Sequence, residues 1–327
     1  MSKLVTIYGG SGFIGRHVAR HMAKQGWRVR VAVRHPNQAH FVRPYGVVGQ
    51  VEPVFCNIRD DDSVREVMHG ADAVVNCVGI LAEGGRQTFD AVQEAGAIRI
   101  AGIAAESGVA RLVSISSINA DPDSEVRYLA SKGRAEIGIR EVFPAAVILR
   151  PSIVFGPGDS FFNRFAQMTR FGPILPVVGG NTRFQPVYVD DVARAAVKGV
   201  LGEAEPGVYE LGGPDVDTFR ELMVQMLGTI RRRRLVVNLP FWLGGLMGRV
   251  FDGMSWMTGG LFSGPLSRDQ VHNLRHDNVV RPGARGLADL GIEASSMEAI
   301  LPEYLWRFRP SGQYAAIKDS AKNLRDT

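Results

Sequence analysis

A short apolar strand that runs directly into a glycine-rich turn constrains this fold more than any other feature. Residues 4–8 are apolar, and glycines follow at positions 9, 12 and 15. In that spacing the first glycine allows a tight turn, the second allows backbone N–H groups to approach a pyrophosphate, and the third allows close packing of strand and helix. The helix that follows adds its positive N-terminal end. We therefore expect a dinucleotide to contact Gly9, Ser11, Gly12, Phe13, Ile14, Gly15 and Arg16.

The first half of the chain alternates apolar strands with helical stretches. Further strands are expected at residues 29–33, 51–55, 73–77, 112–115 and 147–149. Helical stretches are expected between them at residues 63–69 and 89–107. This βαβ rhythm predicts an α/β fold, a Rossmann-type doubly wound parallel sheet that binds ligand at the carboxyl ends of its strands.

The regular alternation of strands and helices ends at about residue 157, which predicts a smaller, interleaved C-terminal lobe. We expect residues 1–156 to form the NADP-binding domain, with residues 184–213 returning to it. Residues 157–183 and 214–327 would form the C-terminal interaction lobe. Within these segments, Asp190 or Asp191 is expected to cap a helix, and Thr218 with Glu221 forms a capping-box pattern.

Composition excludes several classes of protein. The chain has 327 residues, of which 45% are hydrophobic and 22% are charged, as in ordinary globular proteins. Its net charge of +5 does not by itself indicate nucleic-acid binding, and no aromatic-studded basic strand supports that function. Cys56 and Cys77 lie in apolar stretches, so we expect free thiols. The histidines form no ligand-spaced cluster, so no metal is expected.

The residue after the second strand bears on which dinucleotide is bound. NAD-binding proteins usually place an acid there, but this chain has Arg34, which would pair with the 2′-phosphate of NADPH. Arg16 would supply a second cation. Asn57 and Ile58 after the third strand, and Cys77, Val78 and Gly79 after the fourth, fall where the adenine and ribose would lie. A solvated surface arginine remains the alternative for Arg34.

Tyr128 and Lys132 are four residues apart and share one face of an expected helix. Such a lysine can lower the pKa of the tyrosine and hold the nicotinamide ribose, which makes the phenol an acid–base group at neutral pH. Ser117, from the serine cluster after the preceding strand, is placed to bind a substrate oxygen. The alternative is an inert surface pair.

Together these motifs resemble the short-chain dehydrogenase/reductase superfamily, in its extended and atypical branches. The resemblance covers residues 9–15 and 76–79, the serine cluster, Tyr128 with Lys132, and residues 150–156 and 185–192. It implies that Pro151 and Ile153 border the nicotinamide. It also implies that Ser117, Tyr128 and Lys132 are the catalytic set of the family, here retained or vestigial.

Within the superfamily the chain is similar to the alpha subcomplex subunit nine family, the NAD(P)H-binding accessory subunits of respiratory complex I. The residues that carry this likeness are 9–16, 116–120, 127–136, 266–271 and 277–280. The likeness implies tight, structural NADPH outside the main electron path and other complex I subunits as partners. Retention of Ser117, Tyr128 and Lys132 leaves turnover open.

Residues 231–262 read as a membrane-facing stretch. Four arginines at 231–234 precede a segment rich in Leu, Phe, Trp and Met, and no uncharged run reaches the roughly 20 residues of a spanning helix. Read as a helix from Pro240, the segment has one narrow polar stripe and a broad apolar face, which suits an anionic membrane surface or a protein groove. A lid over the lobe itself is the alternative.

These features leave three hypotheses. The first is a non-catalytic NADPH-binding subunit, peripheral on the cytoplasmic face of a bacterial inner membrane, since no signal or transit peptide fits ahead of the strand at residues 4–8. The second is a freestanding NADP-dependent reductase, epimerase or dehydratase, and the third is a regulator that senses NADPH. No polar constellation in the lobe identifies a substrate.

Overall fold

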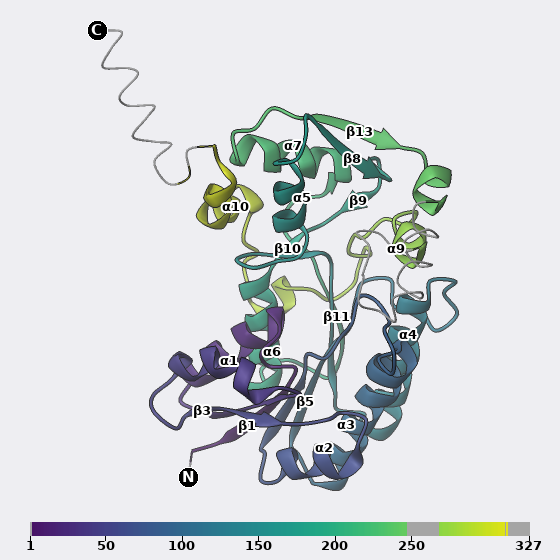
Figure 1. Cartoon of the computed structure of the whole chain (residues 1–327). Coiled ribbons are helices and arrows are strands. Elements are labelled where there is room, and N and C mark those ends of the chain that lie inside the picture. Colours follow the sequence, from purple (N-terminus) through teal and green to yellow (C-terminus); the bar gives the residue numbers. More distant parts are fainter. Residues whose placement is uncertain (1, 247–267, 311, 313–327) are drawn as a thin grey trace, which may run out of the picture.

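The computed structural model describes residues 2–246, 268–310 and 312, and its centre is a seven-stranded parallel sheet (Figure 1). The strands lie in the order β11-β6-β5-β4-β1-β2-β3. Their bounds are β1 Leu4–Tyr8, β2 Arg28–Val33, β3 Val51–Phe55, β4 Ala73–Asn76, β5 Arg111–Ile115, β6 Val147–Pro151 and β11 Gly207–Leu211. The order reverses between β1 and β4, so the crevice at that switch point opens at the strands' carboxyl ends. The expected Rossmann-type fold is confirmed.

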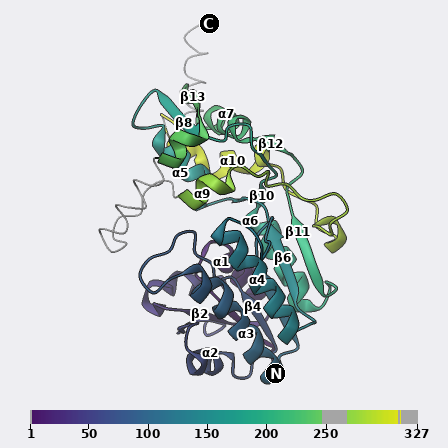
Figure 2. The ribbon, with the colours of Figure 1, turned by 90° about the vertical axis from the view of Figure 1, so that its right-hand side faces the viewer.

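Helices cover both faces of the sheet because its strands are apolar on both sides (Figure 2). One face is covered by α1 (Phe13–Lys24) and α6 (Val189–Leu201), which pack on each other. The other is covered by α2 (Asp61–Met68), α3 (Ala95–Glu106) and α4 (Arg127–Val142). Each face has its own hydrophobic core, and the short π-helix η3 (Asp90–Glu94) leads into α3. Two 3₁₀ helices, η1 (Pro36–Gln38) and η2 (His40–Tyr45), connect β2 to β3.

A third hydrophobic core lies in the C-terminal lobe above the carboxyl end of the sheet (Figure 1). The lobe contains small two-stranded sheets that pair β7 with β10, β9 with β12, and β8 with β13. These strands are β7 Val154–Phe155, β8 Ile174–Val178, β9 Arg183–Phe184, β10 Val187–Tyr188, β12 Asp217–Thr218 and β13 Leu235–Leu239. Its helices are α5 Phe162–Met168, α7 Phe219–Thr229, α9 Arg268–Asn273 and α10 Met297–Leu305, with the 3₁₀ turn η5 Trp306–Phe308. The 3₁₀ turn η4 Ala288–Leu290 belongs instead to the sheet domain, because Leu287, Leu290 and Ile292 pack in its core.

Two capping expectations had different outcomes. The capping box of Thr218 and Glu221 at the start of α7 is confirmed, since each side chain bonds the other residue's backbone N–H. The expectation that Asp190 or Asp191 caps α6 is wrong: both lie inside its first turn, and Tyr188 is the cap residue. Tertiary partners explain the difference, because Asp190 bonds His21 of α1 and Asp191 accepts the N–H of Ser295.

Residues 231–246 include a strand as well as the helix expected from Pro240. Leu235–Leu239 is strand β13, paired in parallel with β8, and residues 241–246, directly after Pro240, are helical as the sequence predicts. The remainder of the expected membrane-facing stretch, residues 247–262, lies outside the described residues, as does nearly all of the polar tail after Pro310. In the described part of the chain, every helix is too short or too polar to cross a bilayer.

Candidate functional site

The glycine turn has the backbone geometry that its sequence predicts. Gly9 has a φ of +72°, a conformation that other residues adopt at a cost. A side chain at Gly15 would collide with the backbone of Gly9 and Gly10, which is why α1 can approach β1 so closely. A Cβ at Gly12 would meet only the Gly9 carbonyl, at 3.1 Å, so this glycine borders open space above the turn. The turn thus forms a cradle that a side chain at Gly12 would fill.

The N-terminal end of α1 is free to receive an anion. Its cap residue is Gly12, and in the described structure neither a side-chain cap nor an acidic residue in the first turn occupies this end. The first backbone N–H groups of a helix lack intrahelical acceptors and carry partial positive charge. Ser11, Phe13 and Ile14 lie beside these groups. The turn and the helix end therefore fit the pyrophosphate of a dinucleotide.

Arg34 and Arg16 differ in what they contact. Arg34 follows β2 at the carboxyl edge and is exposed, and its guanidinium has no hydrogen-bond or ion-pair partner in the described ranges. Arg16 instead donates a hydrogen bond to the carbonyl of Pro157 at 2.7 Å and lies over the Phe13 ring. Arg16 is thus held by the loop after β7 through one of its guanidinium nitrogens, and its role as a second cation for the nucleotide stays a prediction.

The segments after β3 and β4 reach the same edge of the sheet. Asn57 and Ile58 are half-buried there, and the Asn57 side chain accepts the backbone N–H of Arg59. The sequence reasoning missed Arg59, whose guanidinium contacts Asn57 and the Arg86 carbonyl, although a basic residue directly after Asn57 and Ile58 was a signal.

After β4, the buried Asn76 side chain accepts the N–H of Val78 and so shapes the turn that contains Cys77 and Gly79. A Cβ at Gly79 would lie 3.8 Å from the Lys132 ammonium, so this turn lies beside the Lys132 side chain of α4. Both cysteines are free thiols, as expected. Burial raises the pKa of Cys77 to about 12, so its thiol is protonated and unreactive at neutral pH.

Helix α4 presents Tyr128 and Lys132 toward the end of β5, as the sequence predicts. The Lys132 ammonium donates to the carbonyl of Ile115 at 3.0 Å, and burial lowers its pKa to about 8, although Glu136 and Cys77 oppose the shift. Burial raises the pKa of Tyr128, and a hydrogen bond with Ser117 offsets only part of that change. The expected lowering of the tyrosine pKa by Lys132 is therefore not found in this structure. The phenol is fully protonated at neutral pH.

A buried charge network lies behind these groups. Arg150 contacts Glu136 at 2.6 Å and Glu210 at 3.4 Å, while Glu136 also accepts the hydroxyl of Ser116. The carboxylates are paired, as buried charges must be. Arg150 immediately precedes Pro151, and Ile153 follows two residues later, so the network fixes the loop that the sequence places beside the nicotinamide.

Asp269 is a second residue that sequence reasoning did not identify as part of the site. Its two carboxylate oxygens accept the backbone N–H groups of Arg127 and Tyr128, at 3.0 and 3.2 Å. Asp269 belongs to residues 266–271, one of the ranges that carry the likeness to the complex I subunits, but its separation from Tyr128 by 141 positions leaves no local signal of this contact.

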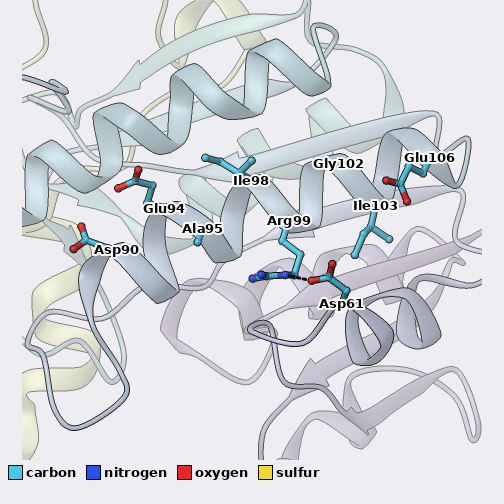
Figure 3. A pocket seen from close by; sticks show the side chains of 9 residues that line it. All are labelled: Asp61, Asp90, Glu94, Ala95, Ile98, Arg99, Gly102, Ile103 and Glu106. Atoms are coloured by element: carbon cyan, nitrogen blue, oxygen red, sulfur yellow. Dashed lines mark hydrogen bonds and ion pairs between the residues drawn. The ribbon is translucent and has the colours of Figure 1, made fainter.

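A separate hollow of about 550 Å³ lies along α3, at the side of the sheet domain (Figure 3). Arg99 and Asp61 form an ion pair on its wall. Its lining residues are Asp61, Asp90, Glu94, Ala95, Ile98, Arg99, Gly102, Ile103 and Glu106. Its four carboxylates are paired with Arg99, Arg134 and Arg65, so these arginines are already engaged and the hollow does not fit the phosphates of a dinucleotide.

Comparison with known proteins agrees with this geometry. The NAD dependent epimerase/dehydratase family matches residues 5–212, which include the glycine turn, Tyr128, Lys132 and β11. The chain belongs to this family. A nicotinamide dinucleotide is therefore the cofactor class that the cradle, the free helix end and the family share.

Family relatives differ in how much of the chain they match. The "NADH dehydrogenase [ubiquinone] 1 alpha subcomplex subunit 9, mitochondrial" of Arabidopsis thaliana is 32% identical over 94% of this chain and 79% of its own length. The protein of the same name from Mus musculus is 30% identical over 94% and 80%. A ceramide reductase of Caulobacter vibrioides is 33% identical, but over only 59% of this chain and 60% of its own.

Among solved structures, the Bordetella bronchiseptica enzyme WbmH in complex with NAD+ has a TM-score of 0.68. It covers 95% of this chain and 100% of its own, at 18% identity. That likeness extends the shared fold through the C-terminal lobe.

Proposed function

We propose that this chain is an NADPH-binding accessory subunit of a membrane-associated NADH:quinone oxidoreductase (complex I). The observation that carries the proposal is the similarity, at 30–32% identity over 94% of the chain, to proteins named as subunits of that complex. The match runs through the lobe as well as the sheet domain. The proposed partners are the other subunits of complex I.

NADPH is the proposed nucleotide, held as a structural or regulatory group outside the main electron path. The unengaged Arg34 supports NADPH over NADH, because a guanidinium pairs with a 2′-phosphate through a planar fork. A structural role is supported by the match of 94% of this chain to proteins named as complex I subunits. When bound, the nicotinamide would supply hydride chemistry. The residues proposed to hold the nucleotide are Gly9, Ser11, Gly12, Phe13, Ile14, Gly15, Arg34, Asn57, Ile58, Cys77, Val78, Gly79, Tyr128, Lys132, Pro151 and Ile153, with Arg16 at the edge.

The C-terminal lobe, residues 157–183 and 214–327, is the proposed interaction region, and residues 1–156 with 184–213 are the proposed nucleotide-binding domain. Phe171 and Trp242 have exposed fractions of 84% and 70%, and Ile174 and Leu235 are exposed side by side on β8 and β13. Of the neighbouring arginines, Arg232 and Arg234 bond carbonyls of the lobe itself, which holds their charge at this surface. Such a basic, apolar surface supports attachment at the cytoplasmic face of a bacterial inner membrane.

A freestanding NADP-dependent reductase is the second candidate. Ser117, Tyr128 and Lys132 are all present and lie together, and the Caulobacter relative is named a reductase. That relative matches 59% of the chain, whereas the subunit 9 proteins match 94%. The longer match favours the accessory-subunit proposal.

Purification of the native protein separates the two candidates. A chromosomally tagged chain should co-purify with NADH:quinone reductase activity from detergent-solubilised membranes and migrate with the complex on native gels. A monomer in the soluble fraction, with none on the quinone reductase, would contradict the subunit proposal. Phe171→Ser combined with Trp242→Ser should release the subunit from the complex. The matched control is Val48→Ser, an exposed apolar residue of the sheet domain that should leave attachment unchanged.

A further inference from the structure

A strap formed by residues 269–281 joins the C-terminal lobe to loops of the nucleotide site. Its first half is anchored in the lobe, where Val271 is buried and the Leu274 carbonyl accepts the hydroxyl of Thr182. Figure 1 shows α9, which contains the start of the strap, beside the lobe-facing end of α4. The contacts described above for Asp269 are made at this point.

The Asp269 carboxylate supplies the cap that α4 lacks in its own sequence. The local cap residue is Val126, whose side chain cannot accept a hydrogen bond. Asp269 accepts the N–H groups of Arg127 and Tyr128 instead, and its negative charge complements the positive end of the helix. The first turn of α4, which carries Tyr128, is thus held by a residue from the lobe.

Asn278 makes the second attachment, to the loop after β6. Its side-chain oxygen accepts both the hydroxyl of Ser152, at 2.6 Å, and the N–H of Ile153, at 3.1 Å. Ile153 is one of the residues proposed to border the nicotinamide. The strap therefore contacts two different walls of the same end of the site.

Asn119 and Arg281 complete the connection. Asn119, in the left-handed conformation after β5, donates to the Asp277 carbonyl at 2.8 Å. Arg281 pairs with Glu210 at 2.6 Å and so joins the buried network that includes Arg150. The attachments reach the first turn of α4, the loops after β5 and β6, and strand β11. The part of the carboxyl edge beyond β1, where Arg34 lies, receives none of the strap contacts described here.

We propose that Asp269 and Asn278 are positioning residues for the nicotinamide half of the nucleotide, an inference that rests on the proposed function. The strap holds the first turn of α4 and the loop after β6 in the arrangement that the bound nucleotide meets. Because coupling between two sites is reciprocal, dinucleotide binding stabilises the seating of the strap, and displacement of the strap weakens binding. The adenosine half of the nucleotide does not depend on it.

Calorimetric titration of the full chain with two ligands tests this division. The ligands are NADPH and adenosine 2′,5′-bisphosphate, which lacks the nicotinamide half. Asp269→Ala should lower the affinity for NADPH about three- to tenfold, a range set by the loss of a helix cap. The affinity for the bisphosphate should stay unchanged. Hydrogen exchange at the amides of Arg127 and Tyr128 should become faster in the same variant.

Two further variants control for a general loss of stability. Asp289 is another aspartate of the C-terminal region, and its side chain accepts the backbone N–H of Gly286. Asp289→Ala should change the affinity for neither ligand. Asn119→Gly removes a strap contact without backbone strain and should weaken NADPH by a smaller factor.

The outcomes separate the inference from the proposed function. Equal loss of both ligands in Asp269→Ala, or unchanged NADPH affinity, would overturn the positioning role while leaving the nucleotide proposal intact. Wild-type protein that binds neither NADPH nor NADH would overturn both.

Discussion

At the proposed adenosine end of the site, Arg34 is exposed with no partner among the described residues, whereas at the nicotinamide end both Lys132 and Tyr128 already bond the protein. Lys132 donates to Ile115, Tyr128 bonds Ser117, and the carboxylates behind them are paired with arginines. The first end offers a new ion pair to a ligand at little cost. The second exchanges existing hydrogen bonds for new ones. This difference favours a protein whose nucleotide affinity comes mainly from the phosphates.

The cradle lies between the two ends, and its loss should have the largest effect. Gly12→Val would place a branched side chain in the open space above the turn, so we expect dinucleotide binding to be abolished. A ligand at a thousandfold excess over its Kd stabilises the native state by about 4 kcal/mol, so cellular levels of the subunit should fall as well. Immunoblotting and thermal melts with NADPH check this. Gly102→Val, in α3 of the sheet domain, where a Cβ meets nothing within 4 Å, is the control.

Arg34→Ala sharpens the comparison at the adenosine end. Loss of one charge-assisted contact should lower the affinity for NADPH about tenfold to a hundredfold, as measured by calorimetry. The affinity for NADH should stay unchanged. The matched control is Arg28→Ala, an exposed arginine at the opposite end of the same strand. Equal affinities for the two dinucleotides in the wild-type protein would contradict the NADPH assignment.

Lys132 gives the nicotinamide end a pH dependence. Its pKa of about 8 means that the ammonium loses its proton as the pH rises through that value, so NADPH affinity should fall several-fold between pH 7 and 9.5. In the free protein the sign is opposite: a lysine pKa below the ordinary 10.5 makes the unfolding free energy increase with pH between about 8 and 10.5. Lys132→Met should remove both dependences, whereas Lys198→Met, at an exposed lysine of α6, should retain them. An unchanged pH profile in Lys132→Met would argue against its contact with the nucleotide.

Tyr128→Phe is expected to have the smallest effect. It removes one hydroxyl whose hydrogen bond is made with Ser117, so quinone reductase activity and subunit abundance should stay within about twofold of wild type. The control is Tyr209→Phe, which removes a hydroxyl that bonds the Glu205 carbonyl far from the site. It shows how much activity and abundance fall when any buried phenol loses its hydroxyl. A large loss of activity in Tyr128→Phe alone, with normal protein levels, would move the conclusion to the reductase.

Local patterns predicted the parts of the molecule that depend on neighbours in sequence. The glycine turn, the strands of the first half and the shared face of Tyr128 and Lys132 follow from backbone geometry and helical periodicity. The acceptor of Arg16 at Pro157 and the cap of α4 at Asp269 did not follow, because each joins residues more than 140 positions apart. Asp190 shows the same limit: its position suited a cap, yet two histidines of α1 bond its carboxylate and lower its pKa.

The late strand β11 has a consequence for folding. Strand β11 takes the edge position beside β6 only after the chain has passed through the first part of the lobe. Helix α6 comes just before β11 in the sequence and covers one face of the central strands. A fragment that ends at residue 156 would expose Val113 and Val147 of that face. The sheet domain and the lobe should therefore unfold in a single calorimetric transition, and ribosome-bound chains should gain protease resistance only after β11 has emerged.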